Sequence, residues 1–342
     1  MPCATKEGTE KMKDFLKKIK RAAVSAIARM RTAHEAKRAF AYDRRQFMRC
    51  AGALHLDREA AALAEITMGY HVLEKGLTMP RRRLGFGKGA VRHLVNLVES
   101  FEARFGRRAQ SDHAARVLCA YRKLHADSPD PMPRLDAFLA ARPYLEPADE
   151  PHVKREDFFA DKDAPFARFS ASRHVCRHFA GPVPRELVEQ AAAIAASAPS
   201  ACNRQHARVY AIDDPVLRDR LFAVQKGTRG FGADADKVLV VTSDLSCVRW
   251  GWERHDCYTN GGMFAMALCY ALHHLGAAHC ILHWSVPPEA DREAHRLLDI
   301  PESEAIVLLV ACGAPPEEFD IAASPRLPVA DILKWRGGQT AH

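Results

Sequence analysis

The sequence predicts a chain in two parts, an all-helical basic domain over residues 1–145 followed by an α+β domain over 166–342, whose central sheet is flanked by helices. Three observations predict this organisation. Apolar residues recur every three or four positions in the first part, helix and strand patterns alternate in the second, and proline and acidic residues gather in a linker at 146–165. With 342 residues, of which 48% are hydrophobic, the chain can form two cores.

The first predicted element is a basic amphipathic helix in the stretch KMKDFLKKIKRAAVSAIARMR, residues 11–31. Lysine and arginine fill most positions outside a helically spaced apolar stripe. The stripe consists of Met12, Phe15, Leu16, Ile19, Ala23, Ile27 and Met30. Such a helix either lies on an anionic membrane surface or packs its apolar stripe on the rest of the domain. Further helices are predicted at 57–75, 88–104 and 112–125.

The basic character of the chain belongs to its first part. Residues 1–150 contain 29 Lys and Arg against 18 Asp and Glu, a balance of +11, whereas the remainder, with 21 against 24, is −3. This asymmetry indicates either an anionic partner, such as nucleic acid, anionic lipid or a phosphorylated substrate, or a solvated basic face.

Between two predicted helices, the stretch YHVLEKGLTMPRRRLGFGKGAVRHLV combines three arginines with a glycine-rich turn and a helix start. Arg81, Arg82, Arg83 and Lys88 would suit an anion at a helix N-terminus. The alternative is a basic loop with an ordinary helix cap. The stretch is not a nucleotide fingerprint, because its glycines match neither G-x-G-x-x-G after a strand nor G-x-x-x-x-G-K-[ST].

The second part alternates between the two kinds of element, which predicts a sheet covered by helices. The predicted strands are 207–212, 237–242, 278–283 and 305–311, and the predicted helices are 184–197, 214–225, 258–275 and 288–299.

Several classes of protein are excluded or disfavoured. No run of about 18 apolar residues occurs and the N-terminus is rich in lysine, so we expect a cytoplasmic protein. The ten cysteines contain no C-x-x-C pair, which argues against a disulfide framework and a zinc ribbon. The histidines and Cys280 within 273–283 lack metal-site spacing, so no metal ligand is assigned.

A series of motifs in the second part carries a resemblance to a known family. In order these are SRHVCRHF at 172–179, APSACNRQH at 198–206, GGMFAMALCYALHHLGAAHC, LHWS, IPESEAIVLLVACGAPPEEF and SPRLP. Their succession, over about 165–336, resembles the nitroreductase family of flavoproteins. No single motif is strong, but their order and spacing together are. The resemblance implies the nitroreductase-like fold, an intertwined homodimer, and FMN at the subunit interface.

The resemblance also implies roles for particular residues. Arg173 and Arg177 would hold the phosphate or ribityl chain of FMN, and Arg326 would close the phosphate site, since phosphate suits converging guanidinium groups. The turn at 198–206 would line the flavin, and LHWS would lie near flavin N5 and O4, with Lys226 or Arg229 near N1. The implied cofactor-binding set is Arg173, His174, Arg177, Pro199, Ser200, Asn203, Gln205, Lys226, Leu282, His283, Trp284 and Arg326.

Two positions depart from the family motif R-R-S-x-R. His174 replaces its second arginine and Val175 replaces its serine, so one charge becomes dependent on pH and a hydroxyl contact is lost. Both changes imply weaker binding of FMN.

A narrower resemblance spans nearly the whole chain. YHVLEKGLTMP, RLGFG, GGMFAMALCYALHHLG and HWS are similar to a subgroup of nitroreductase-like proteins with an extra helical N-terminal region, associated with capsule or exopolysaccharide assembly. This setting implies a lipid-linked or phosphorylated glycan, bound by the basic domain, and a place at the inner membrane face. Nucleic acid is not an expected partner.

The sequence therefore predicts an FMN-dependent oxidoreductase that passes hydride from NAD(P)H through flavin N5 to an unidentified small-molecule acceptor. No catalytic acid or base is assigned, because the flavin carries the redox chemistry. Two alternatives stand beside this prediction. One is a flavin-consuming or dehalogenating relative, and the other is a flavin-free binding or scaffold protein for glycan assembly.

Overall fold

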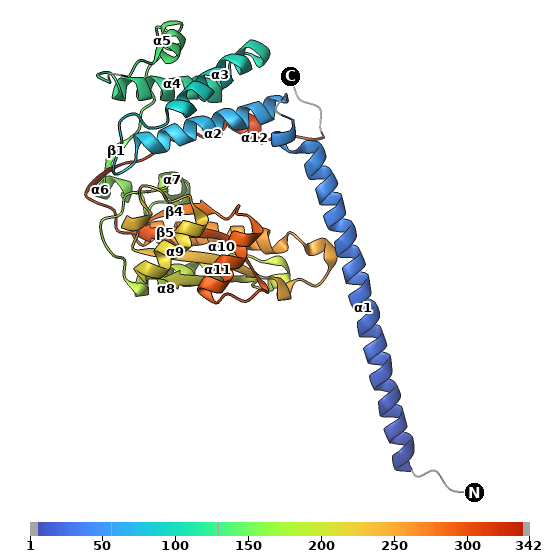
Figure 1. The fold of residues 1–342 in the computed structure, drawn as a ribbon. Coiled ribbons are helices and arrows are strands. Elements are labelled where there is room, and N and C mark those ends of the chain that lie inside the picture. The colour runs from blue at the N-terminus through green and yellow to red at the C-terminus, as the bar shows by residue number, and fades with distance from the viewer. Residues whose placement is uncertain (1–5, 56, 129, 338–342) are drawn as a thin grey trace.

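The computed structural model describes residues 6–55, 57–128 and 130–337. Figure 1 shows a helical part stacked against a mixed part, with the long helix α1 (Lys6–Cys50) projecting past both. Its 45 residues span about 67 Å at 1.5 Å per residue. None of the helices in the described ranges is both long and apolar enough to cross a membrane.

Four further helices complete the N-terminal part, which is helical as predicted. They are α2 (Glu59–Leu77), α3 (Lys88–Phe105), α4 (Ala109–Leu124) and α5 (Pro133–Ala140), and the short helix η1 (Gly52–Leu54) precedes α2. Their core forms because apolar residues recur at helical spacing within each helix. Ile66 and Leu73 of α2, Leu94 of α3 and Leu118 of α4 are fully buried. The predicted ranges match α2, α3 and α4 within three residues.

The glycine-rich segment after α2 is held by close packing. A Cβ atom on Gly76 would lie 2.0 Å from Cε2 of Phe86, so only glycine lets the Phe86 ring rest on α2. Tyr121 donates a hydrogen bond to the carbonyl oxygen of Phe86, and the backbone N–H of Gly85 donates to Nε2 of His125 at 2.8 Å.

The basic side chains of the same segment are paired with acids. Arg81 lies 2.7 Å from Asp234, Lys88 pairs with Asp130, and Arg82 pairs with Asp320. These contacts favour the basic-loop interpretation over an anion site. Two of them join the helical part to the C-terminal part.

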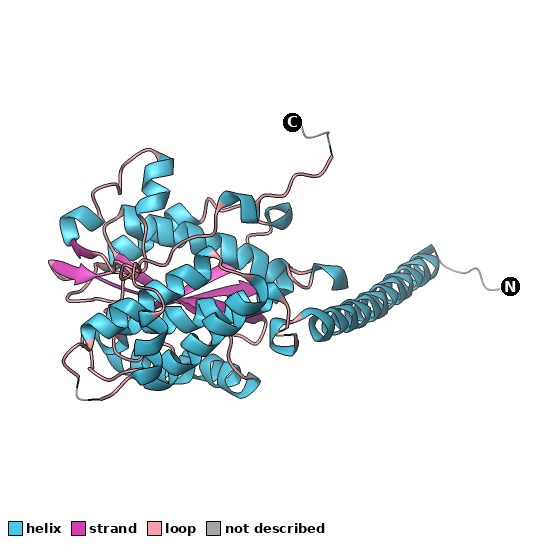
Figure 2. Ribbon diagram, turned by 90° about the horizontal axis from the view of Figure 1, so that it is seen from above, coloured by secondary structure: helices cyan, strands magenta, loops and turns pink. Residues whose placement is uncertain are grey.

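The C-terminal part contains a four-stranded antiparallel sheet in the order β2-β3-β5-β4. The strands are β2 (Ala207–Ile212), β3 (Lys237–Asp244), β4 (Ala278–His283) and β5 (Glu304–Gly313). Two of the predicted strands have these bounds, and the other two are longer by two or three residues. Helices cover both faces (Figure 2), so the apolar runs 238–241 of β3 and 305–311 of β5 are covered on both sides.

Each face of the sheet has its own pair of helices. On one face, α8 (Arg185–Ala195) and α10 (Asp256–His274) bury Leu239 and Val310. On the other, α9 (Pro215–Gln225) and α11 (Pro288–Leu298) cover the alternate residues Val240 and Leu309. This is the predicted α+β arrangement of a central sheet flanked by helices.

Residues 146–165, where we predict a linker, contain short regular elements. Strand β1 (His152–Lys154) pairs antiparallel with β6 (Glu318–Asp320), and α6 (Arg155–Phe158) follows directly. Phe158 is buried in the core of the C-terminal part, which fixes this segment to the sheet domain. Helix α7 (Phe166–Ser172) then leads to the arginine-containing segment, and α12 (Val329–Ile332) lies near the C-terminus.

Contacts that tie helix α1 to the C-terminal part lie in its second half. The short helices η4 (Leu245–Cys247) and η5 (Gly251–Glu253) belong to a loop that reaches α1, and a Cβ atom on Gly251 would lie 2.2 Å from the backbone N of Ala36. Arg254 and His255 pair with Asp43. Packing of the predicted apolar stripe on the rest of the domain is not observed, because its large side chains are at least half exposed.

Candidate functional site

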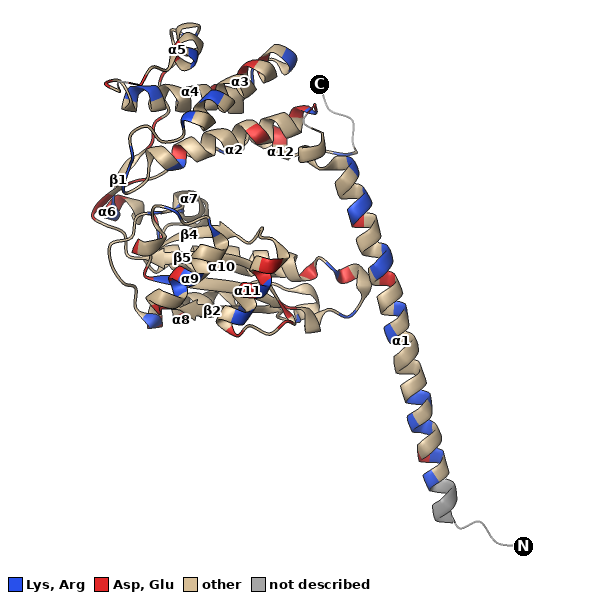
Figure 3. Ribbon diagram, in the orientation of Figure 1, with Lys and Arg blue, Asp and Glu red and all other residues tan. Residues whose placement is uncertain are grey.

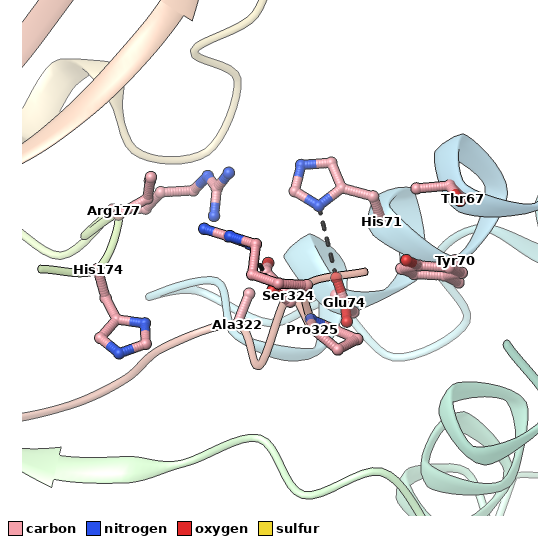
Figure 4. A pocket seen from close by; sticks show the side chains of 11 residues that line it. Thr67, Tyr70, His71, Glu74, His174, Arg177, Ala322, Ser324 and Pro325 are labelled. Carbon is pink, nitrogen blue, oxygen red and sulfur yellow. Dashed lines mark hydrogen bonds and ion pairs between the residues drawn. The ribbon is translucent and has the colours of Figure 1, made fainter. Parts of the chain in front are cut away.

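A cavity of about 300 Å³ lies between α2 and two segments of the C-terminal part. Figure 4 shows Arg177 and His174 on one side, Ser324 and Pro325 below, and Tyr70, His71 and Glu74 of α2 opposite. Arg326 also lines this cavity. Three of the sequence-predicted cofactor residues, His174, Arg177 and Arg326, therefore meet at one cavity although they are distant in the sequence.

The edge of the sheet positions Arg177. The backbone N–H of Cys176 donates to the carbonyl oxygen of His279 at 2.9 Å, so this segment runs beside β4. Side chains of an extended segment alternate, so Cys176 points into the core while its neighbours Val175 and Arg177 line the cavity. His178 donates from Nε2 to the carbonyl oxygen of Thr78 at 2.7 Å, which ties the segment to the end of α2.

A buried acid positions the segment that carries Arg326. Glu150 accepts a hydrogen bond from the backbone N–H of Ala323 at 3.0 Å. Burial raises the pKa of Glu150 to about 8, and the nearby negative charges of Glu74 and Asp320 add to the effect of burial.

Positive charge dominates the cavity. Burial lowers the pKa of Lys75, and the charge of Arg177 lowers it further. The pKa of His174 is lowered by burial and then by the charges of Arg173 and Arg326. Like charges held this close favour a bound anion, and guanidinium groups suit phosphate in particular.

Glu74 is the acid in the cavity wall, and two imidazoles contact it. Its side chain is fully buried, with His113 Nε2 at 2.7 Å and His71 Nδ1 at 3.5 Å. Burial alone would raise the pKa of Glu74, but the hydrogen bonds and charges of His113 and His71 outweigh it and lower the pKa.

Arg173 does not line this cavity. Its charge acts on two buried imidazoles, His273 and His279, whose pKa values are lowered to about 4 and about 3, by burial first and by Arg173 second. Nε and Nη1 of Arg173 are buried without a hydrogen-bond partner. An unpartnered buried guanidinium is costly, so its unused donors fit an anionic ligand near His174.

The turn at 198–206 has an unusual backbone. Cys202, Asn203 and Gln205 have φ of 52°, 54° and 51°, which costs about 1 kcal/mol or more for each non-glycine residue. Within the turn, which includes η2 (Ala201–Asn203), Ser200 Oγ accepts from the backbone N–H of Gln205 at 2.9 Å.

Two contacts from outside the turn hold this conformation. Asn260 of α10 accepts from the backbone N–H of Ala201 at 3.1 Å, and Arg204 makes a bidentate pair with Glu253 at 2.9 Å. Asn203 and Gln205 are left exposed, so their amide groups are available to a ligand or a partner.

The far end of β4 brings together the remaining predicted residues. Gln225 Nε2 donates to the carbonyl oxygen of His283 at 3.0 Å, which places the neighbouring Lys226 at this end of the strand. Trp284 Nε1 donates to Asp291 at 2.7 Å. Leu282 is buried in the core, so only its backbone can face a ligand.

A larger groove of about 1380 Å³ opens at this end of β4. It is lined by His283 and Trp284 together with Tyr258 of α10. A planar ring system or a small acceptor would find both apolar and polar contacts there.

The predicted residues fall into two groups, the turn at 198–206 and the residues along β4, which lie on opposite edges of the sheet. The turn at 198–206 leads into β2, whereas Arg177 and His283 lie along β4, and two strands separate β2 from β4. At the usual strand spacing this separation is about 14 Å. One chain therefore does not bring the turn to Arg177.

The α2 residues Tyr70, His71 and Glu74 were not predicted as site residues. The motif YHVLEKG belongs to the basic glycine-rich stretch and carries part of the resemblance, and nothing in its local pattern shows which wall it forms. No group of three or more His, Cys, Asp or Glu side chains within the described ranges is arranged to hold a metal ion.

Comparison with known proteins identifies the C-terminal part. The model of the Nitroreductase family matches residues 171–228, which include Arg173, Arg177 and the turn at 198–206. No curated protein matches the sequence significantly.

Solved structures resemble about half of the chain. A protein from Desulfovibrio desulfuricans, provisionally named a nitroreductase and crystallised in complex with FMN, is 21% identical with a TM-score of 0.43, over 51% of this chain and 98% of its own. A Nitroreductase Family Protein from Streptococcus pneumoniae is 20% identical with a TM-score of 0.43, over 50% and 100%. A protein from Staphylococcus epidermidis, provisionally named an NAD(P)H:FMN oxidoreductase, is 16% identical with a TM-score of 0.45, over 51% and 96%.

The matched segment contains one wall of the cavity, the strained turn and strand β2 of the four-stranded sheet. The C-terminal half of the chain thus contains a segment that matches the Nitroreductase family model and has the nitroreductase-like fold, preceded by a helical N-terminal region.

Proposed function

We propose that this protein is an FMN-dependent oxidoreductase that takes electrons from NAD(P)H and delivers them to a small-molecule acceptor. The observation that carries the proposal is the convergence of Arg177 and Arg326 on one cavity. The match to the Nitroreductase family over 171–228 supports flavin as the ligand.

The chain's own residues would bind and orient the cofactor. Arg177 and Arg326 would hold the phosphate. The backbone of 282–285 and the side chain of Lys226 lie farther along β4, where the isoalloxazine ring would be oriented. When bound, FMN would supply the chemistry by accepting hydride at N5.

The separation of the two residue groups supports a homodimer. The turn at 198–206 of one chain would meet the Arg177 edge of a second chain, because the two sites lie on opposite edges of one sheet. Two equivalent sites would then form in a symmetric dimer.

The lysines and arginines of α1, together with its exposed apolar stripe, support a peripheral position at an anionic membrane surface. Figure 3 shows Lys and Arg distributed along the free part of this helix. A lipid-linked or phosphorylated glycan in polysaccharide biosynthesis fits the same chemistry, since it presents phosphate beside a lipid surface.

Reconstitution with FMN tests the function. We expect the purified protein to absorb near ~450 nm, either as isolated or after addition of FMN, and to oxidise NAD(P)H only in that form. Arg326→Ala should weaken FMN binding about 10-fold or more, because it removes a charge-assisted hydrogen bond. Arg336→Ala, near the exposed C-terminus, is the matched control and should bind normally.

Other outcomes would redirect the assignment. A colourless protein that FMN cannot reconstitute contradicts the proposal and favours a scaffold role in glycan assembly. Breakdown products of flavin formed under oxygen would instead indicate a flavin-consuming relative.

A further inference from the structure

The phosphate cavity is walled on one side by the N-terminal helical region rather than by the nitroreductase-like part. Tyr70, His71 and Glu74 lie on one face of α2, at helical spacing, and all three line the cavity with Arg177 and Arg326. Figure 4 shows His71 projecting from α2 toward the side where Arg177 stands. The matched family segment does not include α2.

A buried acid controls the orientation of His71. The fully buried Glu74 lies between His113 Nε2, at 2.7 Å, and His71 Nδ1, at 3.5 Å. A carboxylate removed from water requires such partners. With Nδ1 directed at Glu74, Nε2 of His71 lies on the other side of the ring, where it can donate to a ligand when both ring nitrogens carry a proton.

The charges on the opposite wall select the kind of ligand. Arg177 and Arg326 come from separate segments, and Lys75 of α2 lies close enough to Arg177 for their charges to oppose each other. Glu74 supplies one carboxylate to the lining against the two guanidinium groups, so positive charge is in excess. A phosphate group would balance them and would accept a hydrogen bond from His71.

We propose that His71 is a phosphate ligand in this cavity and that Glu74 is its positioning residue, so that the helical region completes the cofactor site. The identity of the ligand as FMN rests on the proposed function, whereas the preference for a phosphate monoester rests on the cavity itself. The helical region and the nitroreductase-like part then form one binding unit.

The test compares FMN with riboflavin, which lacks the phosphate, by quenching of flavin fluorescence in the full chain. His71→Leu should weaken FMN binding about 10- to 100-fold, the value of a hydrogen bond to a charged group, and leave riboflavin binding unchanged. Glu74→Gln should weaken FMN binding less and should also spare riboflavin. His93→Leu, at an exposed position on α3, is the matched control and should behave as the wild type.

A second measurement separates this inference from the proposed function. Inorganic phosphate should raise the thermal midpoint of the flavin-free wild type and should do so much less for His71→Leu. If FMN and phosphate act equally on His71→Leu and the wild type, the role of His71 is wrong while the flavin function stands. If the wild type binds phosphate through His71 but never binds FMN, the flavin function fails and the phosphate site stands. Equal loss of FMN and riboflavin in His71→Leu would reduce the residue to a structural role and overturn the proposal.

Discussion

At the scale of single residues, the structure depends on positions where close packing or a hydrogen bond to a carboxyl group restricts which side chain fits. Gly76 admits the Phe86 ring onto α2, and Glu150 holds the segment that leads to Arg326. Neither role follows from residue type alone, because each depends on a neighbour distant along the chain or across the fold.

Gly76→Ala should destabilise the protein. The new Cβ atom would meet the Phe86 ring at 2.0 Å, and overpacking of this kind costs about 1–3 kcal/mol of the free energy of unfolding. Gly89→Ala in α3 is the control, because no atom lies within 4 Å of its Cβ position and alanine favours a helix by about 1 kcal/mol. Chemical unfolding of the two variants should therefore move their midpoints in opposite directions. Equal midpoints would contradict the close packing of α2.

Glu150 should make stability fall as pH rises. Its pKa is raised from 4.5 to about 8, so the folded state keeps a proton that the unfolded state releases between these values. The contribution is fully present below about pH 4.5 and is lost as pH rises to about 8. Glu150→Gln has no proton to lose, so its thermal midpoint relative to wild type should be higher at pH 8.5 than at pH 5. An unchanged difference would show that Glu150 is not held protonated by burial.

At the scale of elements, α1 exposes apolar side chains, and the turn at 198–206 combines a strained backbone with exposed amide groups. The stripe of α1 exposes Phe15, Ile19 and Ile27 by half or more. The turn holds three residues at positive φ while leaving the amide groups of Asn203 and Gln205 exposed. Both features are costly in isolation, and the proposed membrane and dimer contacts would offset that cost.

The free half of α1 should bind anionic vesicles. Lys17→Glu/Lys18→Glu/Lys20→Glu should abolish sedimentation with vesicles that contain phosphatidylserine, since each lysine near such a surface contributes about 1 kcal/mol. Lys334→Glu, at an exposed position near the C-terminus, serves as the control, and vesicles of phosphatidylcholine alone should bind neither protein. Binding of the triple variant as strong as wild type would exclude an electrostatic role for α1.

Asn203→Gly should separate stability from function. Glycine adopts φ of 54° without strain, so the free energy of unfolding should rise by about 1 kcal/mol. FMN binding should weaken, because the exposed amide would no longer reach the ring. A variant that is both more stable and unimpaired in FMN titration would remove Asn203 from the cofactor site.

At the scale of the whole molecule, the sheet places the predicted cofactor residues on opposite edges, and the proposed dimer would build each site from two chains. Mixed dimers test this division. Arg326→Ala in one chain and Asn203→Ala in the other place both defects in one site and leave the second site intact. We expect the mixed dimer to bind about one FMN tightly, whereas each parent dimer binds both equivalents weakly. Two weak sites in the mixed dimer would mean that each site is built from a single chain.

The sequence predicts the parts of the molecule that local patterns control. The apolar runs at 207–212 and 278–283 predict β2 and β4 with correct bounds, and helical spacing predicts α2 to α4, because each pattern reflects burial of one or two faces. The ordered motifs predict the fold of the C-terminal half, and His174, Arg177 and Arg326 do lie at one cavity.

Only the tertiary structure decides how separate elements meet. It places α2 over the phosphate cavity, directs Arg173 toward His273 and His279, leaves the stripe of α1 exposed, and puts the turn at 198–206 two strands away from β4. The physical reason is that these outcomes depend on contacts between residues far apart in the chain. Periodicity and spacing report only the type of each element and which of its faces is buried.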